Sequence, residues 1–144
     1  MTAYADTSFL GSAYLTQAHS RAATAILQSL KTPLPYTALQ VLEFRNAMRL
    51  AVFRGEIDQA RRDTAFADVA NDLAIGLLAT TTLHWADMLR EAERLSASHS
   101  ETLGSRSLDL LHVAAALTLG AREFLTFDTR QAALAKAAGL RVRP

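Results

Sequence analysis

Cysteine is absent from this chain of 144 residues, which excludes disulfide bonds and thiolate metal sites. Glycine and proline are scarce, at six and three residues, and no repeat, low-complexity stretch or linker divides the chain. Neither sign of charge is in excess, because 15 Lys and Arg against 14 Asp and Glu give a formal charge of +1. An anionic partner must therefore be recognised at a local site rather than attracted by a global field.

Long apolar runs are lacking as well. The first residues have neither the basic segment nor the apolar stretch of a signal peptide. The longest apolar runs, such as Leu73–Ala79, are far shorter than the roughly 20 residues that cross a bilayer. We therefore expect a cytoplasmic protein without a membrane partner, and the length fits one domain over residues 1–144.

Short apolar segments alternate with longer amphipathic ones along the chain. The predicted strands are residues 2–6, 34–37, 77–80, 123–126 and 140–142. The predicted helices are residues 9–30 with a break near His19, residues 38–53 capped by Thr37, and residues 56–73, 82–98, 106–119 and 129–138. Residues 99–105 are predicted to form a polar loop. This alternation predicts an α/β, doubly wound fold, with a parallel sheet of about five strands flanked by helices on both faces.

Four carboxylates stand out from this pattern. Asp6 ends the first strand and Asp128 follows the fourth, where ligands bind in open parallel sheets. Glu43 and Asp109 lie in strongly apolar helical stretches, where a carboxylate needs a partner because desolvating its charge is costly. No lysine is near any of them in the sequence, so Mg²⁺ or Mn²⁺ is an attractive common partner.

Ordinary structural roles are the alternative for each of these acids taken alone. Glu43 and Asp109 could form the polar edge of an amphipathic helix, and Asp6 and Asp128 could cap the helices that follow them. The other ten acids fit structural roles, since several of them alternate with arginines on solvated helix faces.

Histidine is not expected to carry catalysis. His84 and His99 lack partners at the sequence spacing of metal ligands, and His19 lies at the predicted helix break. His112, one turn after Asp109, is interpreted as a packed helix residue rather than a donor at the site, so a Ser/His/Asp hydrolase is not expected. A haloacid-dehalogenase-like phosphatase needs a second Asp where this chain has Ser8. A receiver domain needs an Asp after the third strand, and none is present.

At these residues the chain resembles the PIN-domain ribonucleases, and most closely the VapC-type toxins of toxin–antitoxin pairs. The resemblance rests on four segments in the expected order: YADTSFL at 4–10, ALQVLEFRNA at 38–47, RSLDLLHVAAAL at 106–117 and FLTFDTRQ at 124–131. Together they span almost the whole chain.

The resemblance implies a metal-dependent endoribonuclease that hydrolyses RNA phosphodiester bonds with Mg²⁺ or Mn²⁺. The family's acids map onto four residues of this chain as catalytic metal ligands: Asp6, Glu43, Asp109 and Asp128. Glu43 is expected to act partly through water. The supporting polar residues are Thr7, Ser8 and Thr126, and the candidates for RNA contacts are Arg106, Arg130, Arg45 and Arg49.

The resemblance also implies partners for the chain. As a toxin, the protein would pair with an antitoxin and form a homodimer, and the helices predicted at 37–53 and 82–98 offer surfaces for either. Two alternatives stay open: an RNA-processing PIN nuclease outside a toxin system, and a non-catalytic scaffold that binds RNA or protein. Metal binding separates the scaffold from the nuclease, because only the nuclease requires it.

Overall fold

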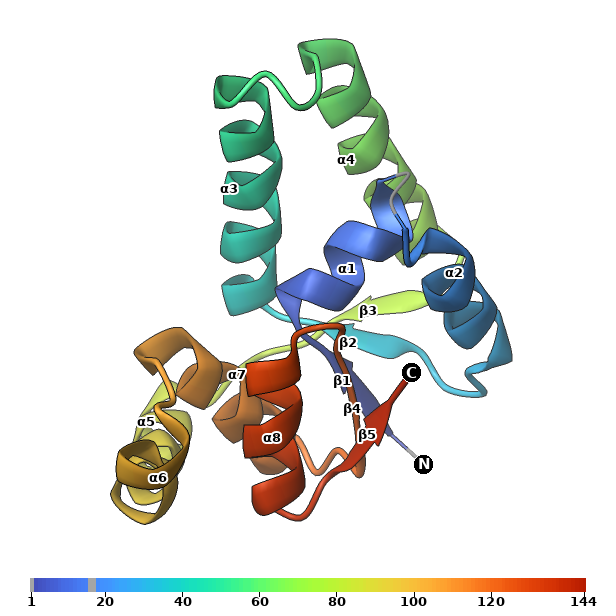
Figure 1. The fold of residues 1–144 in the computed structure, drawn as a ribbon. Helices are drawn as coiled ribbons and strands as arrows, with labels where there is room; N and C mark the ends of the chain where they lie inside the picture. Colours follow the sequence, from blue (N-terminus) through green and yellow to red (C-terminus); the bar gives the residue numbers. More distant parts are fainter. Residues whose placement is uncertain (1, 16–17) are drawn as a thin grey trace. The chain divides into compact units, whose positions relative to one another are not determined.

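The computed structural model describes residues 2–15 and 18–144 and is drawn in Figure 1. The chain forms two compact units, the first of Met1–Asp6 with Thr82–Pro144 and the second of Thr7–Thr81. The interpretation of residues 1–144 as one domain stays a prediction. Thr16 and Gln17, which fall in the helix predicted at 9–30, lie outside the described residues.

The first unit is built on three parallel strands. They are β1 (Ala3–Ala5), β4 (Glu123–Leu125) and β5 (Arg141–Arg143), in the order β1-β4-β5. Ala5 pairs with Leu125, and the backbone pairing continues because the Asp6 N–H donates to the Leu125 carbonyl at 3.1 Å. The Thr126 N–H likewise donates to the Arg143 carbonyl at 2.9 Å. Asp6 and Thr126 are therefore neighbours at the carboxyl edge of this sheet.

The first unit contains five described helical segments. They are α5 (Trp85–Leu95), the π-helical turn η1 (Ser96–Ser100), α6 (Glu101–Leu103), α7 (Ser107–Thr118) and α8 (Thr129–Ala137). Helix α7 packs against both α5 and α8, and α8 also contacts β5 (Figure 1). Residues 112–116 of α7 are all buried, as the almost wholly apolar sequence of this helix predicts.

Two expectations for this unit were wrong. Most of the loop predicted at 99–105 is helical, because η1 and α6 extend to Leu103; only residues 104–105 lie outside a helix, and Gly104 ends α6 with a φ of 67°, which suits glycine. On α5, the apolar side chains of Trp85 and Leu89 are 47% and 54% exposed. The helix begins at Trp85, three residues later than predicted, and buries Met88, Ala92 and Leu95.

The second unit pairs two parallel strands with four helices. Its elements are α1 (Thr7–Tyr14), α2 (Ser20–Ser29), β2 (Leu34–Tyr36), α3 (Ala38–Phe53), α4 (Gln59–Ala74) and β3 (Leu78–Thr80). As predicted, Thr37 caps α3: its Oγ1 accepts the Gln40 N–H, and Gln40 Oε1 accepts the Thr37 N–H. Helix α4 begins later than predicted because Asp58 caps it, accepting the Arg61 N–H at 2.7 Å.

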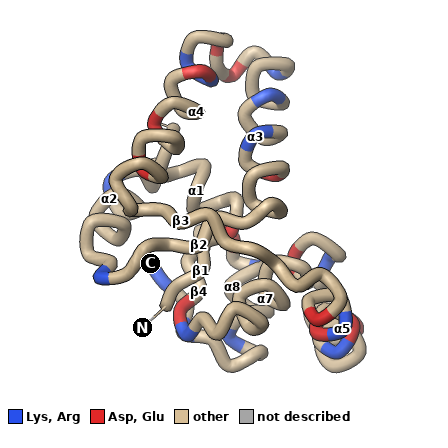
Figure 2. Tube along the Cα trace, turned by 180° about the vertical axis from the view of Figure 1, so that it is seen from behind, with Lys and Arg blue, Asp and Glu red and all other residues tan. Residues whose placement is uncertain are grey.

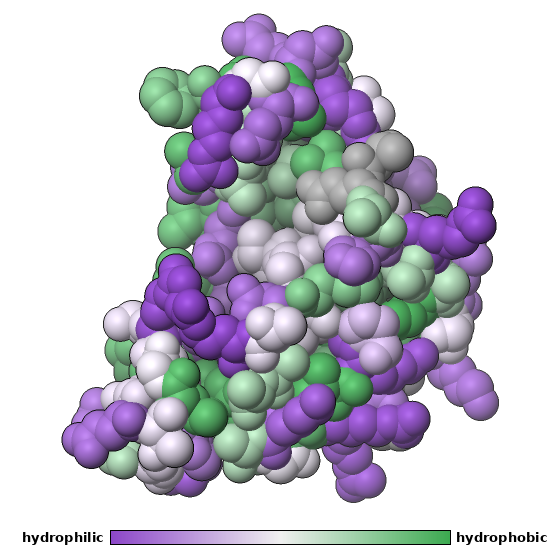
Figure 3. All heavy atoms as spheres, viewed as in Figure 1, coloured by the Kyte–Doolittle hydropathy of each residue, from purple (hydrophilic) through white to green (hydrophobic). Residues whose placement is uncertain are grey.

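The α/β fold class is confirmed. The five described strands are all paired in parallel, three in one sheet and two in another. Acidic and basic residues are interspersed along α4 and α5, as expected of solvated faces (Figure 2). On α5, a hydrogen bond from Arg94 lowers the pKa of Glu91. Hydrophobic and hydrophilic residues also mix on the face drawn in Figure 3. Within the described part of the chain, no helix is long and apolar enough to span a membrane.

Candidate active site

A buried carboxylate lies at the carboxyl edge of β1. Asp6 is only 4% exposed, and its Oδ2 accepts a 2.5 Å hydrogen bond from Thr126 Oγ1, which follows β4. The same Thr126 hydroxyl accepts the backbone N–H of Asp128 at 3.0 Å. One buried hydroxyl thus connects the acid at the end of β1 to the loop that carries the second predicted acid.

Asp128 serves as the N-cap of α8, which was the structural alternative considered for it. Its Oδ1 accepts the backbone N–H groups of Arg130 and Gln131, at 2.9 and 3.0 Å. Among the described residues, no hydrogen-bond donor to Oδ2 is found. A cap that uses one oxygen leaves the other free to act as a ligand, so the structural and functional roles are compatible.

Asp109 lies in the first turn of α7 and is half-buried. Its Oδ2 accepts the backbone N–H of Arg106 at 3.2 Å, which helps to start the helix. Arg106 is the N-cap of α7 and precedes its first residue, Ser107. The Arg106 side chain is exposed. Asp109 therefore has an identifiable structural partner as well as its predicted role.

A hydrogen bond between β1 and α7 relates Asp109 to Asp6. Tyr4 Oη and His112 Nδ1 are 2.9 Å apart, and both side chains are buried. Asp6 follows Tyr4 by two residues on the same face of the strand, and Asp109 precedes His112 by about one helical turn. Since helices run opposite to the strands they cover in parallel α/β layers, both steps lead to the same edge of the sheet. His112 is buried, as expected of a packed helix residue, and its role at the site stays a prediction.

Glu43 lies in the second unit, on α3. Its Oε1 accepts a 2.8 Å hydrogen bond from Thr7 Oγ1, the first residue of α1. Thr7 directly follows Asp6 in the chain. Thr7, Ser8 and Glu43 are all half-buried. The predicted supporting role of Thr7 thus has a specific partner, whereas the grouping of all four acids stays a prediction.

The donor chemistry of these residues fits a hard divalent cation. Carboxylate and hydroxyl oxygens are what Mg²⁺ and Mn²⁺ prefer, and Asp6, Asp109 and Asp128 all belong to the first unit. Within residues 2–15 and 18–144, however, no three His, Cys, Asp or Glu side chains lie close enough together to hold a metal ion. The metal-ligand set accordingly stays a prediction.

The arginines expected to contact RNA have different surroundings. Arg45 and Arg49 of α3 both lie over the Phe66 ring of α4, at 5.2 and 5.5 Å from its centroid. Neither forms an ion pair with any described residue. Arg130 is exposed in the first turn of α8. These side chains keep their guanidinium donors available for an anion.

Sequence reasoning missed two buried polar pairs. The first is Tyr4 with His112, which are 108 residues apart and come together only through the packing of α7 on β1. The second involves Glu123, which is buried at the start of β4 and pairs with Arg143 at 3.0 Å and more loosely with Arg141 at 3.7 Å. Glu123 is thus a structural acid, as expected for the acids outside the predicted site.

Comparisons with known proteins agree on the fold. VapC20 of Mycobacterium tuberculosis, a toxin that cleaves the sarcin-ricin loop, matches with a TM-score of 0.71 and 20% identity, over 99% of this chain and 100% of that one. FitAcB of Neisseria gonorrhoeae matches with a TM-score of 0.69 and 18% identity, over 99% and 97%. VapBC2 of Rickettsia felis, bound to a DNA fragment from its promoter, gives 0.70 and 14%, over 99% and 98%.

At these identities the likeness is one of fold, and no curated protein sequence matches the chain. The model of the PIN domain family, by contrast, matches residues 3–137. That span contains all four segments on which the resemblance rests and every predicted ligand. The chain belongs to the PIN domain family.

Proposed function

We propose that this protein is an endoribonuclease that hydrolyses RNA phosphodiester bonds with the help of Mg²⁺ or Mn²⁺. The observation that carries the proposal is the link from Asp6 through the Thr126 hydroxyl to the Asp128 backbone, at the carboxyl edge of the parallel sheet. This edge is where open α/β sheets bind ligands. A buried carboxylate oriented there by a dedicated hydroxyl is typical of a site rather than of a surface.

Four carboxylates take part in this proposal as ligands: Asp6, Glu43, Asp109 and Asp128. Thr126 orients Asp6, and Thr7 orients Glu43, each through a hydrogen bond to one carboxylate oxygen. When bound, the divalent cation neutralises charge on the scissile phosphate and lowers the pKa of the attacking water. Because carboxylates alone would repel the phosphate, substrate binding also requires the exposed arginines.

The substrate is held by its phosphates in this proposal. Arg45, Arg106 and Arg130 each present an exposed guanidinium. Guanidinium groups form paired hydrogen bonds with phosphate oxygens, so they suit an RNA backbone without specifying its sequence.

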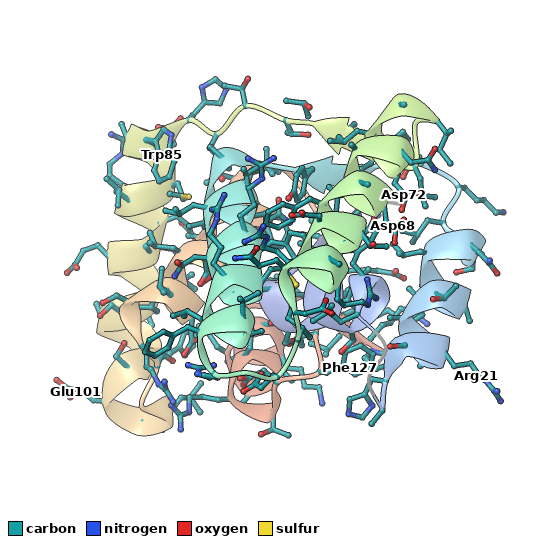
Figure 4. The ribbon with its side chains drawn as sticks, turned by 90° about the horizontal axis from the view of Figure 1, so that it is seen from above. Arg21, Asp68, Asp72, Trp85, Glu101 and Phe127 are labelled. Carbon is teal, nitrogen blue, oxygen red and sulfur yellow. The ribbon has the colours of Figure 1, made fainter. Side chains whose placement is uncertain are left out.

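A toxin of a toxin–antitoxin pair is the setting we infer for this activity. The similar solved structures include a VapC toxin and a VapBC2 assembly. Exposed apolar side chains support a protein partner, namely an antitoxin or a second copy of the chain. On α3 Phe53 is 86% exposed, and on α5 Trp85, labelled in Figure 4, is also exposed.

Cleavage of total RNA by the purified chain, with Mg²⁺ or Mn²⁺ and then with EDTA, tests the activity. Sequencing the new RNA ends in cells that express the intact protein or Asp6→Asn identifies the substrate. We expect metal-dependent ends that are missing with Asp6→Asn. A folded protein that neither cleaves RNA nor binds Mn²⁺ is instead the non-catalytic scaffold. Neutralisation of cleavage by a small protein encoded beside it favours the toxin over an RNA-processing nuclease.

A further inference from the structure

A buried polar pair joins strand to helix in the first unit. Tyr4 of β1 and His112 of α7 share a 2.9 Å hydrogen bond in the core, and Phe124 of β4 stacks on the Tyr4 ring at 5.7 Å between centroids. Most of the buried side chains of this unit are aliphatic or aromatic. Burying a phenol and an imidazole costs desolvation energy that a Phe and a Leu would avoid, so packing alone does not explain this pair.

A hydrogen bond fixes the position of a helix along the strand on which it packs, and apolar contacts do not fix it. Apolar side chains keep much of their contact when a helix shifts along a strand. The Tyr4–His112 bond, by contrast, is lost if α7 moves by the rise of two residues, about 3 Å. The bond therefore determines which residues of α7 and β1 lie at the same level.

The residues at that level include two proposed metal ligands. From His112 to Asp109 is about 4.5 Å toward the amino end of α7. From Tyr4 to Asp6 is about 6.6 Å toward the carboxyl end of β1. The two displacements point the same way and differ by about 2 Å, so the bond places the two carboxylates at the same edge of the sheet.

We propose that Tyr4 and His112 are positioning residues: their hydrogen bond sets the level of Asp109 relative to Asp6, and with it the affinity for a divalent cation. This inference rests on the proposed function, because it takes both acids as ligands. Metal affinity depends on the residues that hold the ligands in place. Replacing such a supporting residue lowers the affinity for the metal by about 10–100-fold.

The test measures Mn²⁺ binding to the full-length protein without RNA, using electron paramagnetic resonance of free Mn²⁺, alongside thermal melting. Tyr4→Phe should weaken Mn²⁺ binding about tenfold and lower the melting temperature. The double variant Tyr4→Phe/His112→Leu should melt closer to the intact protein, because both partners are removed together, yet keep the weakened affinity. His112→Gln keeps a hydrogen-bonding group and should retain most of the affinity.

A matched control comes from the same unit. Glu123→Gln disturbs a buried polar pair at the amino end of β4, away from the carboxyl edge, so it should lower stability and leave Mn²⁺ affinity unchanged. If the double variant binds Mn²⁺ as tightly as the intact protein, the pair is only structural and the inference is overturned. If the intact protein binds no Mn²⁺, the proposed function fails first, and this inference fails with it.

Discussion

The Thr126 hydroxyl donates a hydrogen bond to Asp6 Oδ2 across 120 residues of sequence. Because Thr126 Oγ1 also accepts the Asp128 N–H, one small side chain fixes the carboxylate of Asp6 and the start of the α8 cap together. Variants of the predicted ligands separate a role of this orientation in metal binding from a role in folding alone.

Asp6→Asn should abolish RNA cleavage and leave the fold intact. Asn has the shape of Asp and can still hydrogen-bond to Thr126, but it lacks the negative charge that binds a cation. Cleavage of RNA with Mg²⁺ or Mn²⁺, together with circular dichroism, measures both effects. Asp68→Asn on α4 is the surface control and should cleave like the intact protein (Figure 4). Full activity of Asp6→Asn would remove Asp6 from the site.

Glu43→Gln should slow cleavage strongly, while His112→Gln should change it far less. Gln keeps an amide oxygen to accept the Thr7 hydroxyl, so the loss in Glu43→Gln reflects the missing charge. Excess Mn²⁺ should restore part of the rate if Glu43 supports a metal ion. Rates measured over a range of Mn²⁺ concentrations test this. An equal collapse in both folded variants would mean that His112 takes part in the chemistry itself.

Local signals made much of the fold predictable. Thr37 and Gln40 three residues apart, followed by an apolar helix, are sufficient to place the start of α3 at Ala38. The positions of Asp6 and Asp128, each directly after a predicted strand, likewise indicated the carboxyl edge of the sheet. Residues 99–105 were misread because polar residues such as Ser100 and Glu101 do not exclude a helical turn, and Gly104 is the actual stop.

Long-range partners were beyond such reasoning. Tyr4 and His112 are 108 residues apart, and the sequence around one of them does not indicate the other as its partner. Thr126 could be predicted as a polar neighbour of Asp128, but its bond to Asp6 depends on the β1–β4 register. The exposure of Leu89 likewise depends on which face of α5 packs against α7, and that face is decided by tertiary contacts.

Alkaline pH should destabilise the protein through Tyr14. Burial, and its 2.6 Å hydrogen bond to Asp72, raise the pKa of Tyr14 far above its usual value of 10. Above pH 10 the unfolded chain loses this proton and the folded chain keeps it, so the free energy of unfolding falls as pH rises, by up to about 1.4 kcal/mol per pH unit. Burial raises the pKa of Tyr36 as well, which adds to the same trend.

Tyr14→Phe separates this contribution from the rest. The variant should be less stable near neutral pH, by about 1 kcal/mol, because the bond to Asp72 is lost. Its stability should then fall less steeply between pH 10 and 12 than that of the intact protein. Urea unfolding at several pH values measures both slopes, and identical slopes would contradict the assignment to Tyr14.

Arg45 and Arg49 should contribute to RNA affinity through phosphate contacts. Both are held on the Phe66 ring, so little side-chain freedom is lost when a phosphate binds. In an Asp6→Asn background with EDTA, replacing either by Gln should weaken RNA binding and lower the slope of log K against log salt by about one unit. Arg62→Gln, whose side chain pairs with Asp63, is the control. An unchanged slope for both test variants would place the RNA elsewhere.

Mn²⁺ should raise the melting temperature of the intact protein, and Asp109→Asn should lose most of that rise. A ligand that binds only the folded state stabilises it by mass action, so losing one ligand charge weakens both binding and stabilisation. In EDTA the variant should melt close to the intact protein. Removing a negative charge near other carboxylates favours folding, but Asp109 also stabilises the first turn of α7, by about 0.3–1 kcal/mol.

Melting curves near neutral pH with Mn²⁺ or EDTA decide this without knowledge of the substrate. Asn can still accept the Arg106 N–H, so a large loss of stability in EDTA is not expected from the start of the helix. Asp68→Asn should follow the intact protein in both conditions. If Mn²⁺ stabilises Asp109→Asn as much as the intact chain, Asp109 is not a ligand. The non-catalytic scaffold would then account better for a carboxylate whose remaining role is to begin α7.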